Sequence, residues 1–283
     1  MTAVLFGLLT AVLFATSMLC SSRAVRIIPS QSVVGSAMLI GLVITLPIAL
    51  ADGVPDGLTG TNLAWFAVSG LGNAGGLVLV NEALKVGKVG VVAPIVGTEG
   101  AISAVLASML GESIAPLAAF VLAVIVAGVV LSAVAPDPAP VAHERPLRAA
   151  LLATVAAVAF GVSLFATGYL SDALPTSWLL LPARVVGVLV LAIPLLALRR
   201  LQMRKKALPF VLVIGVAEVL GFTAFTIGAR DSVAVASVLA SQFAAIGAIG
   251  AFFFFKERLG RLQVAGVVVL VLGVSALTLL RST

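Results

Sequence analysis

Long stretches without a charged residue constrain this chain more than any other feature of its sequence. Seven of these stretches are long enough to cross a bilayer as a helix: 1–22, 27–51, 57–81, 113–136, 149–171, 232–255 and 262–280. A hydrocarbon core of about 30 Å takes about 20 apolar residues in a helix. Charged residues make up only 10% of the 283 positions, whereas an ordinary soluble domain has about 25%. The sequence therefore predicts an all-α polytopic membrane protein and excludes a soluble enzyme and a disordered chain.

Three further stretches have the length of a span but contain charged residues. They are 86–111, with Lys88 at its edge and Glu99 inside, 173–198, with Arg184 inside, and 207–229, with Glu218 inside. The sequence thus predicts ten transmembrane helices. The first stretch has no basic segment before it, as a cleavable signal peptide would, so we expect it to remain as the first helix. Cys20 is the single cysteine, so no internal disulfide can form.

The basic residues predict how the helices are oriented. Fourteen of the 17 Lys and Arg residues fall in loops on one side of the ten predicted helices, and the longest basic run is 199–206. The other side, which holds both termini, has only Arg230 and Arg281. Positive residues mark the cytoplasmic side of a membrane protein. We therefore expect the chain in the cytoplasmic membrane with both termini outside. Because the net charge of +6 is spread over short loops, it does not indicate nucleic-acid binding.

The chain repeats itself on the two sides of the proline-rich segment 136–140. At an offset of 146 residues, identical residues coincide in the two halves at Phe14 and Phe160, Ser17 and Ser163, Pro29 and Pro175, and Gly41 and Gly187. We therefore divide the chain into a first repeat, 1–135, a linker, 136–146, and a second repeat, 147–283. Five helices in each repeat make the second copy cross the membrane in the opposite sense. Two inverted repeats are typical of secondary transporters, whose substrate site lies near the midplane between them.

The ends of the two repeats resemble the EamA domain, which defines a branch of the drug/metabolite transporter (DMT) superfamily. Each repeat ends with an apolar span, a junction that contains Glu, and a span that contains glycine: Leu110-Gly111-Glu112 with Gly128, and Phe255-Lys256-Glu257-Arg258 with Gly266 and Gly273. Pro94 in the fourth span also fits the pattern. First repeats of the family often carry an Arg in the second helix, where this chain has Met38. Only the second repeat keeps the Arg, as Arg184. The resemblance implies alternating access, with export by proton antiport as the expected direction.

Three charged residues stand inside predicted spans, where each costs roughly 2.5–3.5 kcal/mol on insertion scales. Glu99 and Glu218 lie near the middle of their spans. Arg184 lies about 10 Å from the outer face, at a rise of about 1.5 Å per residue. The repeat adds Asn73, which is the counterpart of Glu218, and Gln242, which falls near the level of Glu99. Because their depths are similar, we expect these five residues to line one cavity and to bind substrate.

Two interpretations of Arg184 stay open. It either pairs with Glu99 or Glu218 and holds the bundle together, or it binds the substrate. In both cases two acids face one base, so one carboxylate lacks a partner. A carboxylate in nonpolar surroundings binds a proton more readily than one in water. This predicts that Glu218 or Glu99, with Glu218 favoured, couples transport to protons.

Aromatic residues gather near the outer ends of the predicted spans. Trp65, Tyr169 and Trp178 form either an interfacial belt or a wall of the cavity. In the second interpretation, Tyr169 and Trp178 contact the substrate. Glu112 and Glu257 are expected to cap the helices that they begin. His143 has no second ligand nearby and the sequence has no phosphate-binding loop, so we expect neither a metal nor a cofactor.

Together these features predict a secondary transporter of a small metabolite or drug, with protons and membrane lipids as further partners, as a monomer or homodimer. Two acids and one arginine give the site a net charge of −1, which favours an organic cation or a zwitterion such as an amino acid. The alternative transporter imports a sugar or nucleotide-like solute, with Arg184 as the anion contact. Rivals of other classes are an intramembrane enzyme, a lipid scaffold and a channel. The spans lack a catalytic set, and the inverted repeat argues against a channel.

Overall fold

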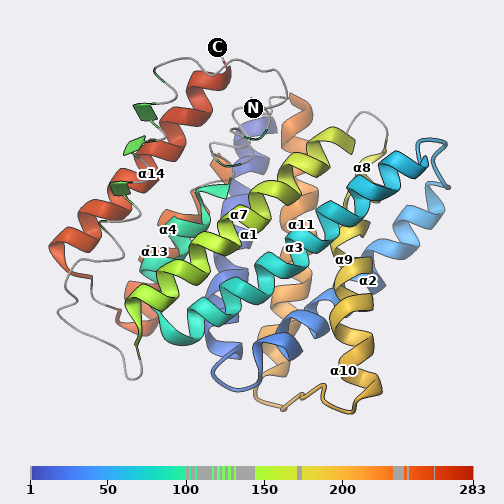
Figure 1. Ribbon diagram of the computed structural model, residues 1–283, viewed down its shortest axis with the longest axis horizontal. Helices are drawn as coiled ribbons and strands as arrows, with labels where there is room; N and C mark the ends of the chain where they lie inside the picture. Colours follow the sequence, from blue (N-terminus) through green and yellow to red (C-terminus); the bar gives the residue numbers. More distant parts are fainter. Residues whose placement is uncertain are drawn as a thin grey trace.

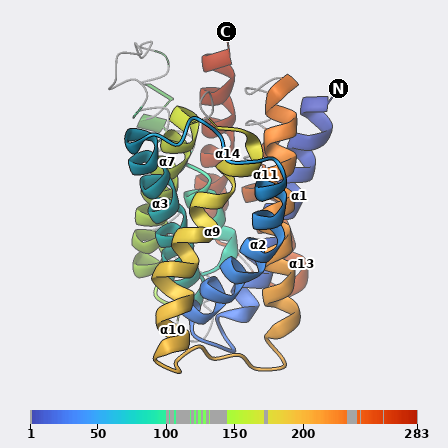
Figure 2. The same ribbon diagram turned by 90° about the vertical axis from the view of Figure 1, so that its right-hand side faces the viewer.

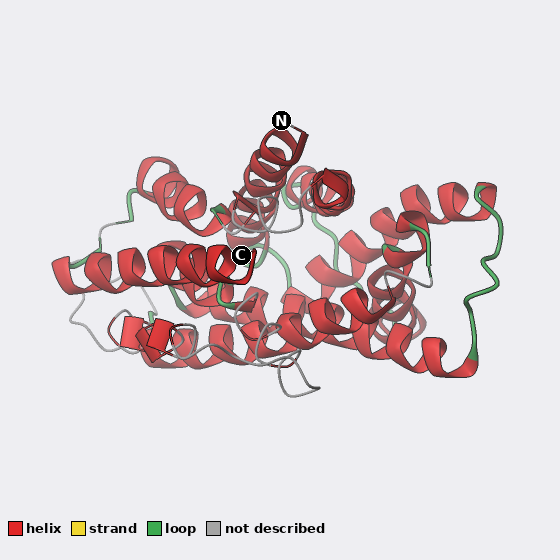
Figure 3. Ribbon diagram, turned by 90° about the horizontal axis from the view of Figure 1, so that it is seen from above, coloured by secondary structure: helices red, strands yellow, loops and turns green. Residues whose placement is uncertain are grey.

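The computed structural model describes residues 2–99, 144–170, 174–231, 239–240, 242–257 and 259–282, together with isolated positions between 102 and 131. Every regular element in these ranges is helical (Figure 3). The longer helices are α1 (Thr2–Ala24), α2 (Ser30–Ala51), α3 (Gly60–Val86), α7 (Pro146–Leu170), α11 (Leu208–Asp231), α13 (Phe243–Phe255) and α14 (Arg261–Ser282) (Figure 1). The shorter ones are α4 (Val89–Val96), α8 (Thr176–Leu179), α9 (Leu181–Gly187), the π-helix η1 (Val188–Ala192) and α10 (Ile193–Ala197).

Six segments of the described chain are long and apolar enough to cross a membrane. They are Val4–Ala24, Ser30–Ala51, Gly60–Val86, Pro146–Thr167, Thr176–Ala197 and Leu208–Gly228. Two shorter apolar helices, Phe243–Phe255 and Val264–Gly273, accompany them. The protein is therefore an all-α, multi-pass membrane protein. The predicted span 113–136 falls mostly outside the described residues, and so does most of the linker, so the count of ten helices stays a prediction.

The two ends of the bundle differ in charge. Both termini lie at one end, as Figures 1 and 2 show, and the connection between α10 and α11 lies at the other. That connection contains the exposed basic run 199–206, interrupted only by Leu201, Gln202 and Met203. Arg23 and Lys85 lie in the last turns of α1 and α3, at the same end. We call it the basic end.

Two predicted spans contain irregular turns near proline, which lacks the N–H that a regular helix needs. α4 contains Pro94 and ends at Val96, and a turn at Gly97 and Thr98 follows. The Thr98 hydroxyl donates to the Ile95 carbonyl at 2.7 Å, which satisfies an acceptor freed by the break. The predicted span 173–198 begins only after Pro175 and is divided into α8, α9, η1 and α10, with Pro182 and Pro194 at helix starts. Thr176–Ala197 is nevertheless one of the six candidate spans, and residues 100–111 of the other predicted span lie mostly outside the described residues.

Two helices of the first half each pack along a helix of the second half. α1 lies along α11, and α3 lies along α7 (Figure 1). A Cβ atom at Gly221 would lie 2.6 Å from the Phe14 ring, and one at Gly76 would lie 2.6 Å from the Phe160 ring. Since Gly76 and Gly221 are 145 residues apart and Phe14 and Phe160 are 146 apart, the two contacts are equivalent. These contacts relate the two halves by an approximate two-fold axis.

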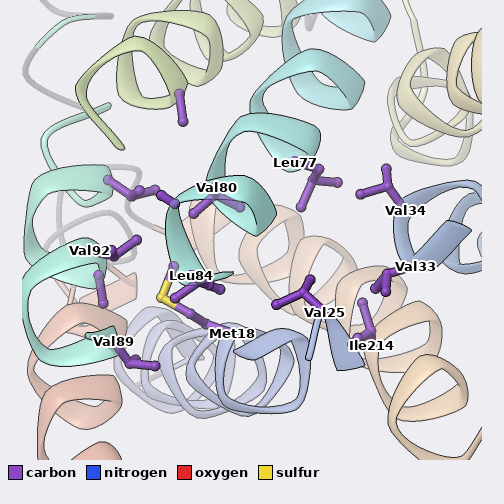
Figure 4. Close-up of a cluster of buried hydrophobic side chains, with 14 of the residues drawn as sticks. Met18, Val25, Val33, Val34, Leu77, Val80, Leu84, Val89, Val92 and Ile214 are labelled. Atoms are coloured by element: carbon purple, nitrogen blue, oxygen red, sulfur yellow. The ribbon is translucent and has the colours of Figure 1, made fainter. Parts of the chain in front are cut away.

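The apolar core lies where α1, α2, α3, α4 and α11 cross. Figure 4 shows part of it, with Val25, Val33 and Ile214 gathered in one group and Leu77 and Val34 pointing toward each other. All five side chains are buried. Three of these helices, α2, α3 and α11, also carry the site described next, so the core fixes the positions of its walls.

Candidate functional site

Arg184 on α9 lies at the centre of the site. Its residue is only 2% exposed. Gly41 on α2 makes room for it, since a Cβ there would lie 2.7 Å from Cδ and 2.8 Å from Nε of Arg184. The guanidinium contacts the Met38 sulfur at 3.7 Å and lies over the Phe222 ring, 5.8 Å from its centroid. Nε has no hydrogen-bond partner among the described residues, so the guanidinium keeps unused donor capacity.

A narrow pocket between α2, α3, α9 and α11 contains this guanidinium. Its polar lining consists of Arg184, Asn81 and Glu218. Its apolar lining consists of Val33, Val34, Ala37, Met38, Leu77 and Ile214. A cation, a carboxylate and a carboxamide thus face an otherwise aliphatic cavity, a combination typical of small-molecule sites.

Glu218 on α11 is half-buried and accepts a hydrogen bond from the Ser17 hydroxyl of α1 at 2.8 Å. Its carboxylate interacts electrostatically with both Arg184 and Glu99. In the part of the chain that the structure describes, no ion pair within 4.0 Å joins Glu218 to Arg184. The two opposite charges therefore line one pocket without neutralising each other by direct contact.

Asn81 on α3 was not predicted as a site residue. It is 1% exposed, and its amide Nδ2 donates to the Leu77 carbonyl at 2.7 Å. Its Oδ1 has no hydrogen-bond partner among the described residues. A buried acceptor without a partner costs free energy, which a bound donor would recover. The sequence feature that could have indicated Asn81 is a carboxamide side chain in an apolar span, next to Glu82.

The other predicted polar residues do not line this pocket. Asn73 is buried on α3, and its Oδ1 lacks a partner among the described residues. Gln242 precedes α13 and donates to the Ser275 hydroxyl of α14 at 2.8 Å. Glu99 follows the break after α4 and is half-buried, and its carbonyl oxygen would lie 3.0 Å from a Cβ at Gly161. Of the five predicted polar residues, the pocket combines Arg184 and Glu218.

Comparison with known proteins decides the family. The model of the EamA-like transporter family matches residues 1–134 and 147–279. The chain belongs to the EamA-like transporter family. A crystal structure described only as that of a protein superposes with a TM-score of 0.68 at 16% sequence identity, over 99% of this chain and 97% of the other. That likeness shows a shared fold. No curated protein matches the chain.

This EamA-like transporter is a membrane transport protein and not an enzyme, and its substrate is a small molecule. The family match covers nearly the whole chain in two copies. It agrees with the exchanged packing of the two halves. Among the described residues, no group of three His, Cys, Asp or Glu side chains could hold a metal ion.

The predicted aromatic residues connect helix ends in this EamA-like transporter. The Tyr169 ring lies 5.0 Å from the Trp65 ring, and Tyr169 is 50% exposed. The Trp178 indole N–H donates to the carbonyls of Ala49 at 3.1 Å and Gly53 at 2.9 Å. Neither Tyr169 nor Trp178 lines the pocket around Arg184. These hydrogen bonds of Trp178 connect α8 to the last turn of α2.

Glu257 caps a different helix from the one expected. It lies in the loop before α14 and accepts hydrogen bonds from the backbone N–H groups of Val89 at 3.3 Å and Gly90 at 3.2 Å. These N–H groups begin α4, where no intrahelical acceptor exists for them. The prediction that Glu257 caps its own helix is therefore wrong. Burial raises the pKa of this carboxyl, although the two backbone hydrogen bonds oppose the shift. Glu112 lies outside the described residues.

Proposed function

We propose that this EamA-like transporter moves a small zwitterion, such as an amino acid, across the cytoplasmic membrane by alternating access. The observation that carries the proposal is the pocket in which Arg184 and Glu218 stand without direct pairing. Arg184 binds the carboxylate of the solute through its unused Nε–H, and Glu218 binds the ammonium group. An organic cation, the other substrate expected from the sequence, would satisfy Glu218 but would leave the buried Arg184 unpaired and repelled.

The proposed energy source is the proton gradient, with substrate exported in exchange for protons. Glu218 supports this role because its carboxylate lies in the pocket and also interacts with Glu99. A proton on Glu218 removes the charge that attracts the ammonium group, so proton and substrate compete for one side chain. Glu99 is the second candidate for the proton.

Ligand-dependent stabilisation tests the substrate class. Purified protein is heated with neutral amino acids, with amines and with sugars. A ligand present at 100 times its Kd stabilises the folded state by about 2.7 kcal/mol, so binding raises the unfolding temperature. We expect the amino acids to do so, and Arg184→Ala to abolish the effect. Arg145→Ala, at an exposed position of the basic end, serves as the matched control. Stabilisation by sugars alone would support the alternative importer of sugar or nucleotide-like solutes.

Flux into vesicles tests the coupling. With the protein reconstituted and a pH gradient imposed, wild-type protein should move the stabilising amino acid against its concentration gradient. Glu218→Gln should remove the response to pH while exchange of substrate persists. Undiminished proton-driven flux in both Glu218→Gln and Glu99→Gln would exclude coupling through these acids.

The orientation is part of the same proposal. The basic end faces the cytoplasm and both termini face outward, because cytoplasmic loops carry the excess of Lys and Arg. Impermeant labelling of a cysteine added at either terminus of intact cells should be positive. The oligomeric state, monomer or homodimer, follows from the mass of the purified protein in detergent.

A further inference from the structure

A compact polar cluster joins α2 to α3 at the basic end. The Ser30 hydroxyl donates to the Glu82 carboxylate. The Lys85 ammonium donates to Oε1 of Glu82 at 2.8 Å and to the Ser30 hydroxyl at 3.4 Å. Arg148 at the start of α7 also interacts electrostatically with Glu82. We call Ser30, Glu82 and Lys85 the Glu82 cluster. Its ion pair, Lys85 with Glu82, lies within α3, and the contacts that cross to α2 are those made by the Ser30 hydroxyl.

The Glu82 cluster lies between the pocket and the basic end. On α2, Ser30 precedes the pocket residue Val33 by less than one helical turn. On α3, Glu82 directly follows the pocket residue Asn81, and Lys85 comes nearly one turn later. Both helices pass from the pocket to the cluster before they reach their ends. A solute that leaves the pocket between α2 and α3 toward the basic end must therefore pass the cluster.

α2 and α3, which form two walls of the pocket, pack mainly on other helices rather than on each other. α2 packs chiefly on α9, η1 and α11, whereas α3 packs chiefly on α7 and α9. The side chains of Lys85 and Glu82 are 30% and 33% exposed, so water reaches the cluster. A few polar contacts that are accessible to water can exchange with hydration when the helices separate.

The repeat does not place an acid at the position equivalent to Glu82. Ser30 corresponds to Thr176, Lys85 to Arg230 and Glu82 to Ile227. The Glu82 cluster is therefore not repeated in sequence at the equivalent positions of the second half.

We infer that Glu82 is the gate residue of the basic end: the hydrogen bond that it accepts from Ser30 holds α2 against α3 and closes the pocket there, and Lys85 on the same helix as Glu82 positions its carboxylate. The inference rests on the proposed alternating access at the Arg184 site. Glu82 acts as a positioning residue, since it sets the separation of two helices and does not line the pocket. Its loss should favour the state that is open to the basic end.

A single reporter cysteine tests the gate. Val34 faces the pocket and is buried, so Val34→Cys in a Cys20→Ser background should react slowly with a membrane-impermeant maleimide. Adding Glu82→Ala should raise the labelling rate from the basic end about tenfold, because hydrogen bonds to a charged group are lost. Glu82→Asp should restore a slow rate. Asp56→Asn, an exposed acid near the opposite end, is the matched control and should leave the rate unchanged.

Two results would overturn the gate. One is an unchanged rate from the basic end in folded Glu82→Ala. The other is an equal rise from both sides, which would indicate general loosening. If Glu82→Ala does not fold, Ser30→Ala removes one partner of the same carboxylate and should raise the rate in the same direction. Labelling requires no substrate, so a failure of the gate is distinct from a failure of the proposed amino-acid transport.

Discussion

At the scale of single residues, the position of Arg184 depends on the absence of a side chain at Gly41. The guanidinium lies against the α2 backbone at a point where any Cβ would overlap it. Its other contacts, the Met38 sulfur and the Phe222 ring, are weak. Gly41 therefore determines where the charge of Arg184 points, more than any hydrogen bond does.

Gly41→Ala should displace Arg184 and weaken substrate binding. We expect a loss of affinity of about tenfold, which corresponds to about 1.4 kcal/mol. The measurement is the substrate concentration that half-stabilises the purified protein. Gly75→Ala on α3 is the matched control, since a Cβ there meets nothing within 4 Å. Equal affinities in the two variants would contradict the role of Gly41.

The charged site residues could be predicted from the sequence and the uncharged ones could not. Arg184 and Glu218 stand out because a charge inside a span is costly and needs a reason to be there. Asn81 and Ser17 carry no such signal, since hydroxyls and amides are common in membrane helices. Asn73 and Gln242 were expected in the pocket because the repeat gives the depth of a residue. It does not give the face of the helix on which the residue lies.

At the scale of elements, the N-terminus of α4 is capped by a residue that is distant in the sequence. Two backbone N–H groups of its first turn are satisfied by Glu257, which comes from the loop between α13 and α14. From its residue type, Glu257 was expected to cap a helix, but the helix expected was the nearest one in the sequence. The turn after α4 and the change from α9 to the π-helix η1 were equally hard to predict, because membrane helices tolerate irregular turns when neighbouring groups satisfy the freed backbone.

The raised pKa of Glu257 predicts a pH dependence of stability. The folded protein binds a proton at Glu257 more tightly than the unfolded chain does. Its contribution to stability is therefore complete below about 4.3, the ordinary Glu value, and is lost as the pH rises through the raised pKa. Wild-type protein should lose more thermal stability over this range than Glu257→Gln. Asp56→Asn should follow the wild type. Parallel curves for wild type and Glu257→Gln would contradict this assignment.

At the scale of the whole molecule, the two halves support each other through matched contacts. α1 of the first half packs on α11 of the second, and α7 packs on α3 in the same way. At both contacts a glycine receives an aromatic ring. The repeat in the sequence predicted two similar halves. Only the structure shows that the described helices of each half pack chiefly against those of the other half.

Substitutions that change the size of the side chains at the two glycine–phenylalanine contacts test this packing. Gly221→Ala should destabilise the protein by about 1–3 kcal/mol, the usual cost of overpacking. Phe14→Leu should relieve the strain in the double variant, because the Phe14 ring occupies the space that the new methyl needs. Phe160→Leu should not restore stability to the Gly221→Ala variant. It should restore stability to the Gly76→Ala variant, because Gly76 is the glycine that the Phe160 ring contacts. Thermal unfolding of these single and double variants measures the effect, and relief by the wrong partner would refute the pairing.

The contact between Met38 and Arg184 has a consequence for how such a protein could arise. These two residues are equivalent, 146 positions apart, and they touch, so they lie on the two-fold axis. In a homodimer of one unduplicated copy, a residue on the axis meets its own twin, and two guanidiniums there would repel. Fusing the copies into one gene product lets a thioether face a single positive charge. Asymmetry at the centre thus requires that the two copies differ in sequence at this position.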